Sequence, residues 1–417
     1  MSRPPARFKP EPFAYHTELE LDIESLSNLG QGLGRIDDWV VFVPFALPDE
    51  RVRARIFRNH KNHSEADLVE VLDPSPHRVE PRCELFGICG GCQYQNYAYE
   101  QQLEWKRTQV AELLSHMAKI ETDVLPIIPS PREWAYRSKI TPHFQKPKNG
   151  KIDAIGFLKA GVRSKLIDIK QCPIASDAIN RALPELREKT HAEALGYRKG
   201  ATLLLRESAE EAALVVTGNT EVCEEHIGDL RFQFAAGEFF QNNPSILPAF
   251  TEHVRNEALK LSSSQPSNRY LVDTYCGSGL FALTCAAHFD QVAGIEINEA
   301  AIDWCTRNAN LNNIDNCQFQ QGDAPAIFEN INFPANQSAV VIDPPRKGSN
   351  PEFIEQLLAF APATIVYVSC NPATQIRDLQ HLLANKAYQI SKVQPFDLFP
   401  QTRHLECVIT LNNNSRS

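Results

Sequence analysis

Acidic side chains stand at the ends of short apolar runs in the C-terminal third of the chain. Asp273 ends the run RYLVD, Glu296 comes near the end of VAGIEI, and Asp323 follows in QQGDA. Asp343 ends a further run, AVVID. Because the carboxyl ends of parallel strands meet at one edge of an open sheet, we expect these acids to gather where such sheets bind ligands. Acids at that edge accept hydrogen bonds from ribose hydroxyls or an exocyclic amine, so the pattern indicates a nucleoside-containing ligand.

A glycine-containing turn follows the first of these runs. Gly277 and Gly279 allow the backbone to turn tightly and to approach a ligand where a strand leads into a helix. Ala282 stands where the GxGxxG fingerprint has its last glycine, and no basic residue is placed to meet a phosphate. NAD-binding folds share the glycine turn and the strand-end acid. The ordered series of turn, Glu and Asp favours S-adenosylmethionine over NAD.

Two further residues are candidates for covalent and acid–base chemistry. Cys370 follows the apolar run TIVYVS and precedes Asn371 and a proline, a turn signal that presents a thiol at the same sheet edge. The alternative is a buried cysteine that acts as a small hydrophobic residue. Glu406 interrupts an otherwise apolar strand, where it is either paired with Arg403 or His404 or acts as a general base.

A separate group of cysteines has the spacing of a metal centre. Cys83, Cys89 and Cys92 lie within ten residues, with two glycines between the last two, and Cys172 is a fourth cysteine followed by proline. Four thiolates suit a [4Fe–4S] cluster or structural zinc. Zinc ribbons usually have a CxxC pair on both sides, and the second half here is a single cysteine, so the spacing favours iron–sulfur. Four unligated thiols are the remaining interpretation.

The elements that must position these residues can be read from hydrophobic periodicity. The C-terminal apolar runs alternate with helix-like segments, which is typical of a doubly wound parallel sheet. The segment FDLFPQTRHLECVITL predicts an antiparallel hairpin that closes the sheet. Residues 99–118 predict an amphipathic helix that could pack on the domain that contains this sheet. We expect an α/β protein with a flexible arm at 1–12, a small β-barrel at 13–75, a cysteine-cluster and mixed α+β central domain at 76–238, and a Rossmann-like S-adenosylmethionine domain at 239–417.

Short alternating runs with glycine and proline turns predict the N-terminal barrel. One of its strands carries Arg51, Arg53 and Arg55 at period 2, which places three guanidinium groups on one face. Arg58 and Lys61 extend the stripe, and no acid interrupts residues 51–62. The stripe is either a groove that follows RNA phosphates or an ordinary solvated face.

Composition limits the function classes. The 417 residues are 43% hydrophobic and 22% charged, and the formal net charge is −9. A polycation that grips nucleic acid by bulk charge is therefore excluded, and any RNA contact must come from a local patch. The basic, proline-rich start is followed by no apolar signal segment, and eleven cysteines are an odd number. We expect a cytoplasmic protein without a membrane anchor, and a monomer.

Taken together, these motifs resemble the RNA 5-methyluridine methyltransferases, the uracil-C5 enzymes of bacterial rRNA and tRNA. The resemblance is carried by DPPR at 343–346, SCNP at 369–372, HLE at 404–406 and GEFFQNN at 237–243. SNLGQGLGR and VFVPFALPDERV resemble the TRAM barrel of that family, an RNA-binding module. The resemblance implies that the S-adenosylmethionine site includes Phe239, Gln241, Asp273, Tyr275, Gly277, Gly279, Glu296, Asp323 and Asp343.

The resemblance also implies a mechanism and a partner. Cys370 falls on the nucleophile that adds to uracil C6, Glu406 falls on the base that removes the C5 proton, and the cysteine group resembles a [4Fe–4S] site of several rRNA enzymes. The barrel and cluster favour large-subunit rRNA over tRNA as the substrate. Two alternatives stay open: an amino-methyltransferase acting on a base or glutamine, which needs no cysteine nucleophile, and a non-catalytic RNA-binding iron–sulfur protein.

Overall fold

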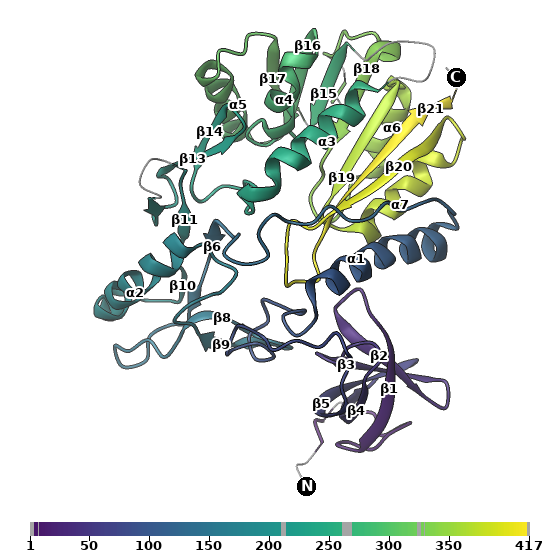
Figure 1. The fold of residues 1–417 in the computed structure, drawn as a ribbon. Coiled ribbons are helices and arrows are strands. Elements are labelled where there is room, and N and C mark those ends of the chain that lie inside the picture. The colour runs from purple at the N-terminus through teal and green to yellow at the C-terminus, as the bar shows by residue number, and fades with distance from the viewer. Residues whose placement is uncertain are drawn as a thin grey trace. The chain divides into compact units, whose positions relative to one another are not determined.

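The computed structural model describes residues 4–6, 8–209, 214–260, 269–322, 327–328 and 330–414 (Figure 1). Contacts divide the chain into two compact units. The first combines residues 1–105, 154–169 and 401–403, and the second combines 106–153, 170–400 and 404–417. This division differs from the three consecutive domains that the sequence suggests, because both units are built from segments far apart in the chain.

The first unit contains a closed five-stranded barrel. Its strands are β1 (Glu18–Leu26), β2 (Gln31–Ile36), β3 (Trp39–Pro44), β4 (Arg51–Asn59) and β5 (His63–Asp73), in the order β1-β2-β3-β5-β4. Alternate residues of β1 and β4, such as Leu21, Val52 and Ile56, point into the barrel core and are buried. This period-2 burial confirms the N-terminal barrel that the alternating runs predicted.

The cysteine-containing loop belongs to this same unit and packs on a hairpin from later in the chain. The hairpin consists of β8 (Ile155–Lys159) and β9 (Val162–Asp168). The Gly90 amide donates to the Leu158 carbonyl at 2.9 Å, and the Ala160 amide donates to the Ile88 carbonyl at 2.9 Å. These backbone bonds explain why residues 154–169 group with the first unit.

The second unit is built on a seven-stranded sheet of order β17-β16-β15-β18-β19-β21-β20. Its strands are β15 (Tyr270–Thr274), β16 (Gln291–Glu296), β17 (Cys317–Gln321), β18 (Ser338–Ile342), β19 (Thr364–Ser369), β20 (Tyr388–Phe396) and β21 (Glu406–Asn413). The first five of these are parallel, and β21 is antiparallel to both of its neighbours. The doubly wound parallel sheet and the closing hairpin are thus confirmed.

Helices cover the sheet as the chain crosses between strands (Figure 1). They are α3 (Leu247–Leu259), α4 (Leu280–Cys285), α5 (Glu299–Leu311), α6 (Pro351–Phe360) and α7 (Pro372–Leu383). Helix α3 packs on α4, and α6 packs on α7. Because crossovers are right-handed and the strand order runs in opposite directions on the two sides of β15, these two sets cover opposite faces of the sheet.

The remaining elements include some whose side chains join the core of the sheet. These remaining elements are α1 (Tyr99–Leu113), the π-helical turn η1 (Leu114–Ala118), β6 (Lys139–Ile140), β7 (His143–Phe144), α2 (Asp177–Ala192), η2 (Ala194–Gly196), β10 (Ala201–Thr202), β11 (Leu205–Glu207), β12 (Val215–Val216), β13 (Val222–Ile227), β14 (Leu230–Ala235), η3 (Pro244–Ile246), η4 (Ala286–His288) and η6 (Ala335–Gln337). Phe232 and Phe234 of β14 lie in the same apolar cluster as Phe250 of α3 and Val341 of β18. The boundary expected at 238/239 therefore falls inside one continuous core. None of the helices in the described part of the chain has the length and apolar character that crossing a bilayer requires.

Candidate active site

One cavity of about 790 Å³ opens at the carboxyl edge of the parallel strands. Strand ends β15, β16, β18 and β19 each contribute residues to its wall, as the positions of the strand-end acids predicted. The predicted site residues that line it are Phe239, Gln241, Tyr275, Gly277, Glu296, Asp343, Cys370 and Glu406. The structure therefore brings the candidate cofactor residues, nucleophile and base into a single cavity.

Glu406 reaches this edge because its strand runs the other way. The first residue of β21 lies at the edge where the parallel strands end, since β21 is antiparallel to β19. Ser369 pairs with Cys407 in this ladder, so Cys370 comes one residue after the pair and Glu406 one residue before it. Gln375 of α7 fixes both strand ends, because its side-chain amide donates to the carbonyls of Tyr367 and Cys407 at 2.8 and 3.0 Å.

The turn after β15 has the backbone that its glycines predicted. Gly277 has φ of 54° and Gly279 has φ of 94°, a region that residues with a Cβ rarely adopt. The buried side chain of Asp273 stabilises this turn, because its Oδ2 accepts from the Ala282 amide at 2.8 Å. Asp273 and Gly279 do not line the cavity among the described residues, so both shape the turn rather than contact its contents.

Glu296 stands at the cavity wall with its carboxylate fixed by backbone amides. Oε2 accepts from Gly277 at 3.2 Å, and Oε1 accepts from Ile297 and Asn298 at 2.9 and 3.0 Å. A carboxylate offers about four acceptor sites, so these three bonds orient the group and leave capacity for a ligand hydroxyl. This geometry fits the predicted ribose-binding role.

The segment before α3 supplies an aromatic face. Phe239 lines the cavity and is 73% exposed, although the adjacent Phe240 is buried against Phe234 with ring centroids 4.4 Å apart. An exposed phenyl ring at a cavity wall is a surface on which a planar ring can stack. Gln241, two residues on, is 6% exposed and also lines the cavity.

The reactive groups have strongly perturbed acidities. Burial, followed by the nearby charges of Glu406 and Asp343, raises the pKa of the Cys370 thiol to about 12. Burial also raises the pKa of Glu406 well above its usual value, and that of Asp343 to about 7. Groups whose acidity is shifted this far by burial and charge, inside one cavity, are typical of catalytic sites.

Arg346 is a member of this site that the motif analysis did not single out. It lines the cavity, and its guanidinium opposes the rise in the Cys370 pKa through its charge and a hydrogen bond. Its backbone carbonyl accepts from Asn371 Nδ2 at 3.0 Å and from Thr374 Oγ1 at 3.2 Å. These bonds join the loop after β18 to the loop after β19. The DPPR segment was the available signal, because it places an arginine three residues after a strand-end aspartate.

Asp323, the remaining predicted cofactor residue, lies outside the described residues. Its neighbour Gly322 lines the cavity.

The candidate metal ligands divide between the two units. Cys83, Cys89 and Cys92 belong to the first and Cys172 to the second. All four are half-buried, and none of the chain's cysteines forms a disulfide. Four half-buried thiols are a donor set that either an iron–sulfur cluster or a zinc ion would accept.

Acids from neighbouring strands interrupt the predicted cationic stripe on β4. Glu20 of β1 lies 3.4 Å from Arg51 and 2.9 Å from Arg53, and Glu65 of β5 lies 3.5 Å from Arg58. The side chains alternate along β4 as predicted, with Val52, Ala54 and Ile56 buried between the arginines. The exposed face is therefore mixed in charge, and the sequence of the strand alone did not reveal this.

Comparison with known proteins places these features in context. The family model described as tRNA (Uracil-5-)-methyltransferase matches residues 216–414, and the TRAM domain model matches residues 16–69. The tRNA (uracil(54)-C(5))-methyltransferase of Schizosaccharomyces pombe is 41% identical over 417 aligned residues, covering 96% of this chain and 79% of the relative. The protein of the same name from Saccharomyces cerevisiae is 34% identical, covering 94% and 73%.

A solved structure has the same architecture. The crystal structure of Pyrococcus abyssi tRNA (uracil-54, C5)-methyltransferase in complex with S-adenosyl-L-homocysteine superposes with a TM-score of 0.73 and 25% identity. The match covers 94% of this chain and 99% of that one.

Proposed function

Because this chain belongs to the tRNA (uracil-5-)-methyltransferase family and is an S-adenosylmethionine-dependent RNA (uracil-C5)-methyltransferase, we propose that its substrate is a tRNA and that Cys370 forms a covalent adduct with the target uracil. Two relatives and the matched crystal structure are named for uracil 54 of tRNA. The preference for large-subunit rRNA expected from the sequence has no support among these proteins. The TRAM barrel supports an RNA partner.

The cavity residues divide into a cofactor side and a base side. With S-adenosylmethionine bound, Phe239 would stack on a planar ring, Glu296 would accept from the ribose hydroxyls, and Gln241 would hydrogen-bond polar groups of the cofactor. The bound cofactor supplies an electrophilic methyl group. Cys370 and Glu406 occupy the side formed by β19 and β21, where the uracil enters after it leaves its stack.

The chemistry follows from making uracil C5 nucleophilic. The Cys370 sulfur, after losing its proton, adds to C6, and the C5=C6 electron pair becomes an enolate that extends to O4. C5 then takes the methyl group. Glu406 removes the C5 proton, the C5–H electrons re-form C5=C6, and the C6–S bond breaks to release Cys370. The net products are 5-methyluridine, S-adenosylhomocysteine and one proton.

The raised pKa values of the cavity residues suit a nucleophile that stays protonated until the substrate binds. With its pKa at about 12, the Cys370 thiol is neutral near pH 7 and resists oxidation and alkylation. Arg346, which lowers the pKa of this thiol, stabilises the thiolate when it forms. Asp343 raises the pKa of both Cys370 and Glu406, so its protonation makes both groups easier to ionise.

Cys83, Cys89, Cys92 and Cys172 are assigned to a [4Fe–4S] cluster. Their half-buried positions and their spacing in the sequence, with a single cysteine in the second half, support this. With four protein thiolates, no iron is left open, so the cluster organises the fold or the RNA surface and takes no part in methyl transfer. Of the barrel stripe, Arg55 and the exposed Lys61 are the residues assigned to RNA phosphates, because Arg51, Arg53 and Arg58 already meet carboxylates.

The observation that carries this proposal is the meeting of Cys370 and Glu406 in one cavity with the cofactor-side residues. We would supply tRNA and rRNA transcripts tritiated at uridine C5 and count the tritium released to water upon addition of S-adenosylmethionine. Release from tRNA, and its loss when uridine 54 is replaced by cytidine, is the expected result. Release from rRNA alone contradicts the tRNA assignment. Methyl incorporation without tritium release contradicts C5 chemistry and indicates an amino-methyltransferase.

A further inference from the structure

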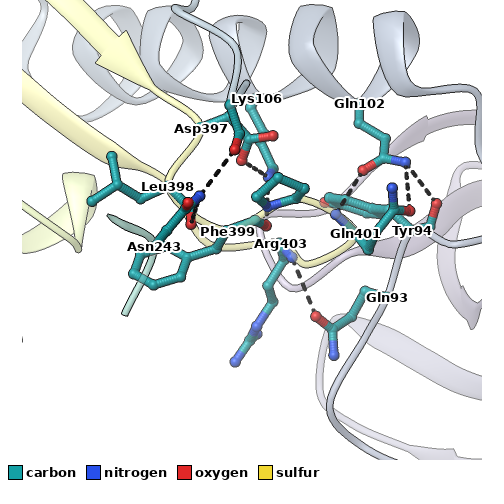
Figure 2. Close-up of polar contacts among 12 residues, drawn as sticks. Gln93, Tyr94, Gln102, Lys106, Asn243, Asp397, Leu398, Phe399, Gln401 and Arg403 are labelled. Carbon is teal, nitrogen blue, oxygen red and sulfur yellow. Dashed lines mark hydrogen bonds and ion pairs between the residues drawn. The ribbon is translucent and has the colours of Figure 1, made fainter. Parts of the chain in front are cut away.

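A completely buried ion pair lies at the root of the hairpin that carries Glu406. Lys106 Nζ is 2.6 Å from Asp397 Oδ1, and both side chains are 0% exposed (Figure 2). Lys106 is on α1, and Asp397 follows the last residue of β20, so they are 291 positions apart in sequence. Burial lowers the pKa of Lys106, and the charge of Asp397 opposes that shift.

Packing alone does not explain such a pair. Removing two charges from water costs as much as their attraction returns, and hydrophobic residues of similar volume are often as stable or more stable. Lys106 and Gln102 are buried on the same face of the helix as Val110 and Leu114, so the charge lies on the core face of an amphipathic helix. A role beyond stability is therefore the better explanation of the charges.

The pair holds the segment that leads to Glu406. Phe396 is directly opposite Glu406 in the β20–β21 ladder, and Asp397 is the next residue. From there, three successive carbonyls accept hydrogen bonds from side chains of the same unit. Asn243 Nδ2 donates to Leu398 at 3.0 Å, Lys106 Nζ donates to Phe399 at 3.2 Å, and the Tyr136 hydroxyl donates to Pro400 at 3.0 Å (Figure 2 shows the first two residues with their partners).

Asn243 joins this segment to the cofactor side. It is 0% exposed and comes two residues after Gln241, which lines the cavity. Its amide also donates to Ser130 Oγ at 3.0 Å, and its Oδ1 accepts from Ser245 at 2.7 Å. Both amide hydrogens of Asn243 are thus used, and one of them holds the 241–243 segment against the carbonyl of Leu398.

We propose that Lys106 and Asn243 are positioning residues that hold the segment after β20 so that Glu406 is aimed at uracil C5. The inference rests on the proposed role of Glu406 as the base. Neither residue lines the catalytic cavity among the described residues, so both act through the backbone of residues 398 and 399. Proton removal is the step that depends on Glu406, and misplacement of a catalytic group by 1 Å can cost about 10²-fold in rate.

The test separates positioning from stability. Lys106→Met leaves Asp397 without its partner and should lower both the melting temperature and kcat. The double variant Lys106→Met/Asp397→Leu removes both charges and should restore most of the melting temperature, but kcat should stay about 10²-fold low. Each protein is assayed with tRNA carrying deuterium at uridine C5. The deuterium isotope effect on kcat should be larger in the double variant than in the wild type, and methylated RNA covalently joined to protein should accumulate on denaturing gels.

Two reference variants make every outcome informative. Glu406→Gln defines the isotope effect and the amount of covalent complex, together called the signature, that follow from loss of proton removal. Lys392→Met breaks a salt bridge to Glu257 elsewhere in the same unit and controls for general destabilisation. Asn243→Leu should reproduce the signature of the double variant, and Lys106→Arg should restore part of kcat. A double variant with wild-type kcat, or with low kcat and no isotope effect, overturns the inference while Glu406→Gln still shows its signature. If Glu406→Gln shows no signature, the assigned base is wrong and the positioning inference falls with it.

Discussion

Cys370 directly follows β19 and Glu406 begins the antiparallel β21, each one residue away from the Ser369–Cys407 pair that joins the two strands. The proposed nucleophile and base are thereby held at the ends of adjacent strands of one sheet. Their closeness is also electrostatic, since Glu406 is the second contributor, after burial, to the raised pKa of the Cys370 thiol. Because the charge of Glu406 raises the pKa of the thiol and the charge of Arg346 lowers it, Cys370 ionises more easily when Glu406 is protonated or when Arg346 is near.

Replacing Glu406 by glutamine should separate methyl transfer from product release. The amide keeps the size of the side chain but cannot take the C5 proton, so the adduct of Cys370 should form, accept the methyl group and then persist. We expect turnover to fall by at least about 10²-fold, with a protein–RNA complex that survives denaturation and carries label from S-adenosylmethionine. The Cys370→Ala protein is the control and should give no complex. Free methylated RNA produced by Glu406→Gln at the wild-type rate would contradict the assignment.

The activity should rise with pH across the neutral range. Folded Cys370 has a pKa of about 12, so the thiolate fraction increases about tenfold per pH unit at all lower pH values. The raised pKa of Glu406 acts in the same direction, because only its carboxylate can remove a proton. We expect kcat/KM for RNA to increase from pH 6 to pH 8.5 without reaching a plateau. Arg346→Gln should lower kcat/KM throughout this range, since loss of the guanidinium raises the thiol pKa further. A plateau beginning at pH 7 would show that the free enzyme already holds a thiolate.

Sequence patterns predicted the sheet and the cavity because the acids and Cys370 come at the ends of parallel strands, and these ends all lie at one edge of the sheet. They did not separate Asp273 from Glu296, both of which end apolar runs. Asp273 lies inside β15 and is turned into the core, where it accepts from Ala282, whereas Glu296 is the last residue of β16 and reaches the cavity. One residue of register decides between a structural and a ligand-facing carboxylate, and apolar periodicity does not fix register that finely.

The contacts that sequence reasoning missed all depend on distant segments. The stripe on β4 contains no acid of its own, and Glu20 and Glu65 come from β1 and β5 through a strand register that a single sequence does not give. Lys106 likewise looks like a solvated lysine of an amphipathic helix until Asp397 is placed beside it. Hydrophobic periodicity assumes that only apolar residues lie on the buried face of a helix. A polar residue that is buried against a specific partner is an exception to this rule.

Replacing cluster cysteines should remove iron without abolishing the active-site chemistry. Anaerobically purified wild-type protein should contain about four irons per chain and absorb near 400 nm, as a [4Fe–4S] cluster requires. Cys89→Ser and Cys172→Ser should each lower the iron content and the thermal stability. Cys317→Ser is the matched control, because Cys317 is also half-buried but lies on β17, away from the cluster residues in sequence. Stoichiometric zinc in place of iron, bound by the same four cysteines, would overturn the assignment.

Cofactor affinity should distinguish the two strand-end acids. Glu296→Gln removes the charge that accepts ligand hydroxyls, and a hydrogen bond to a charged group contributes about 1.5–3 kcal/mol, so the Kd for S-adenosylhomocysteine should rise by about 10- to 100-fold. Asp273→Asn should change that Kd by less than about threefold, because Asp273 does not line the cavity and burial raises its pKa well above the ordinary value. The neutral amide can still accept from Ala282. Calorimetric titration of both variants checks this, with the melting temperature measured alongside. A larger loss of affinity in Asp273→Asn than in Glu296→Gln would reverse the roles given to the two acids.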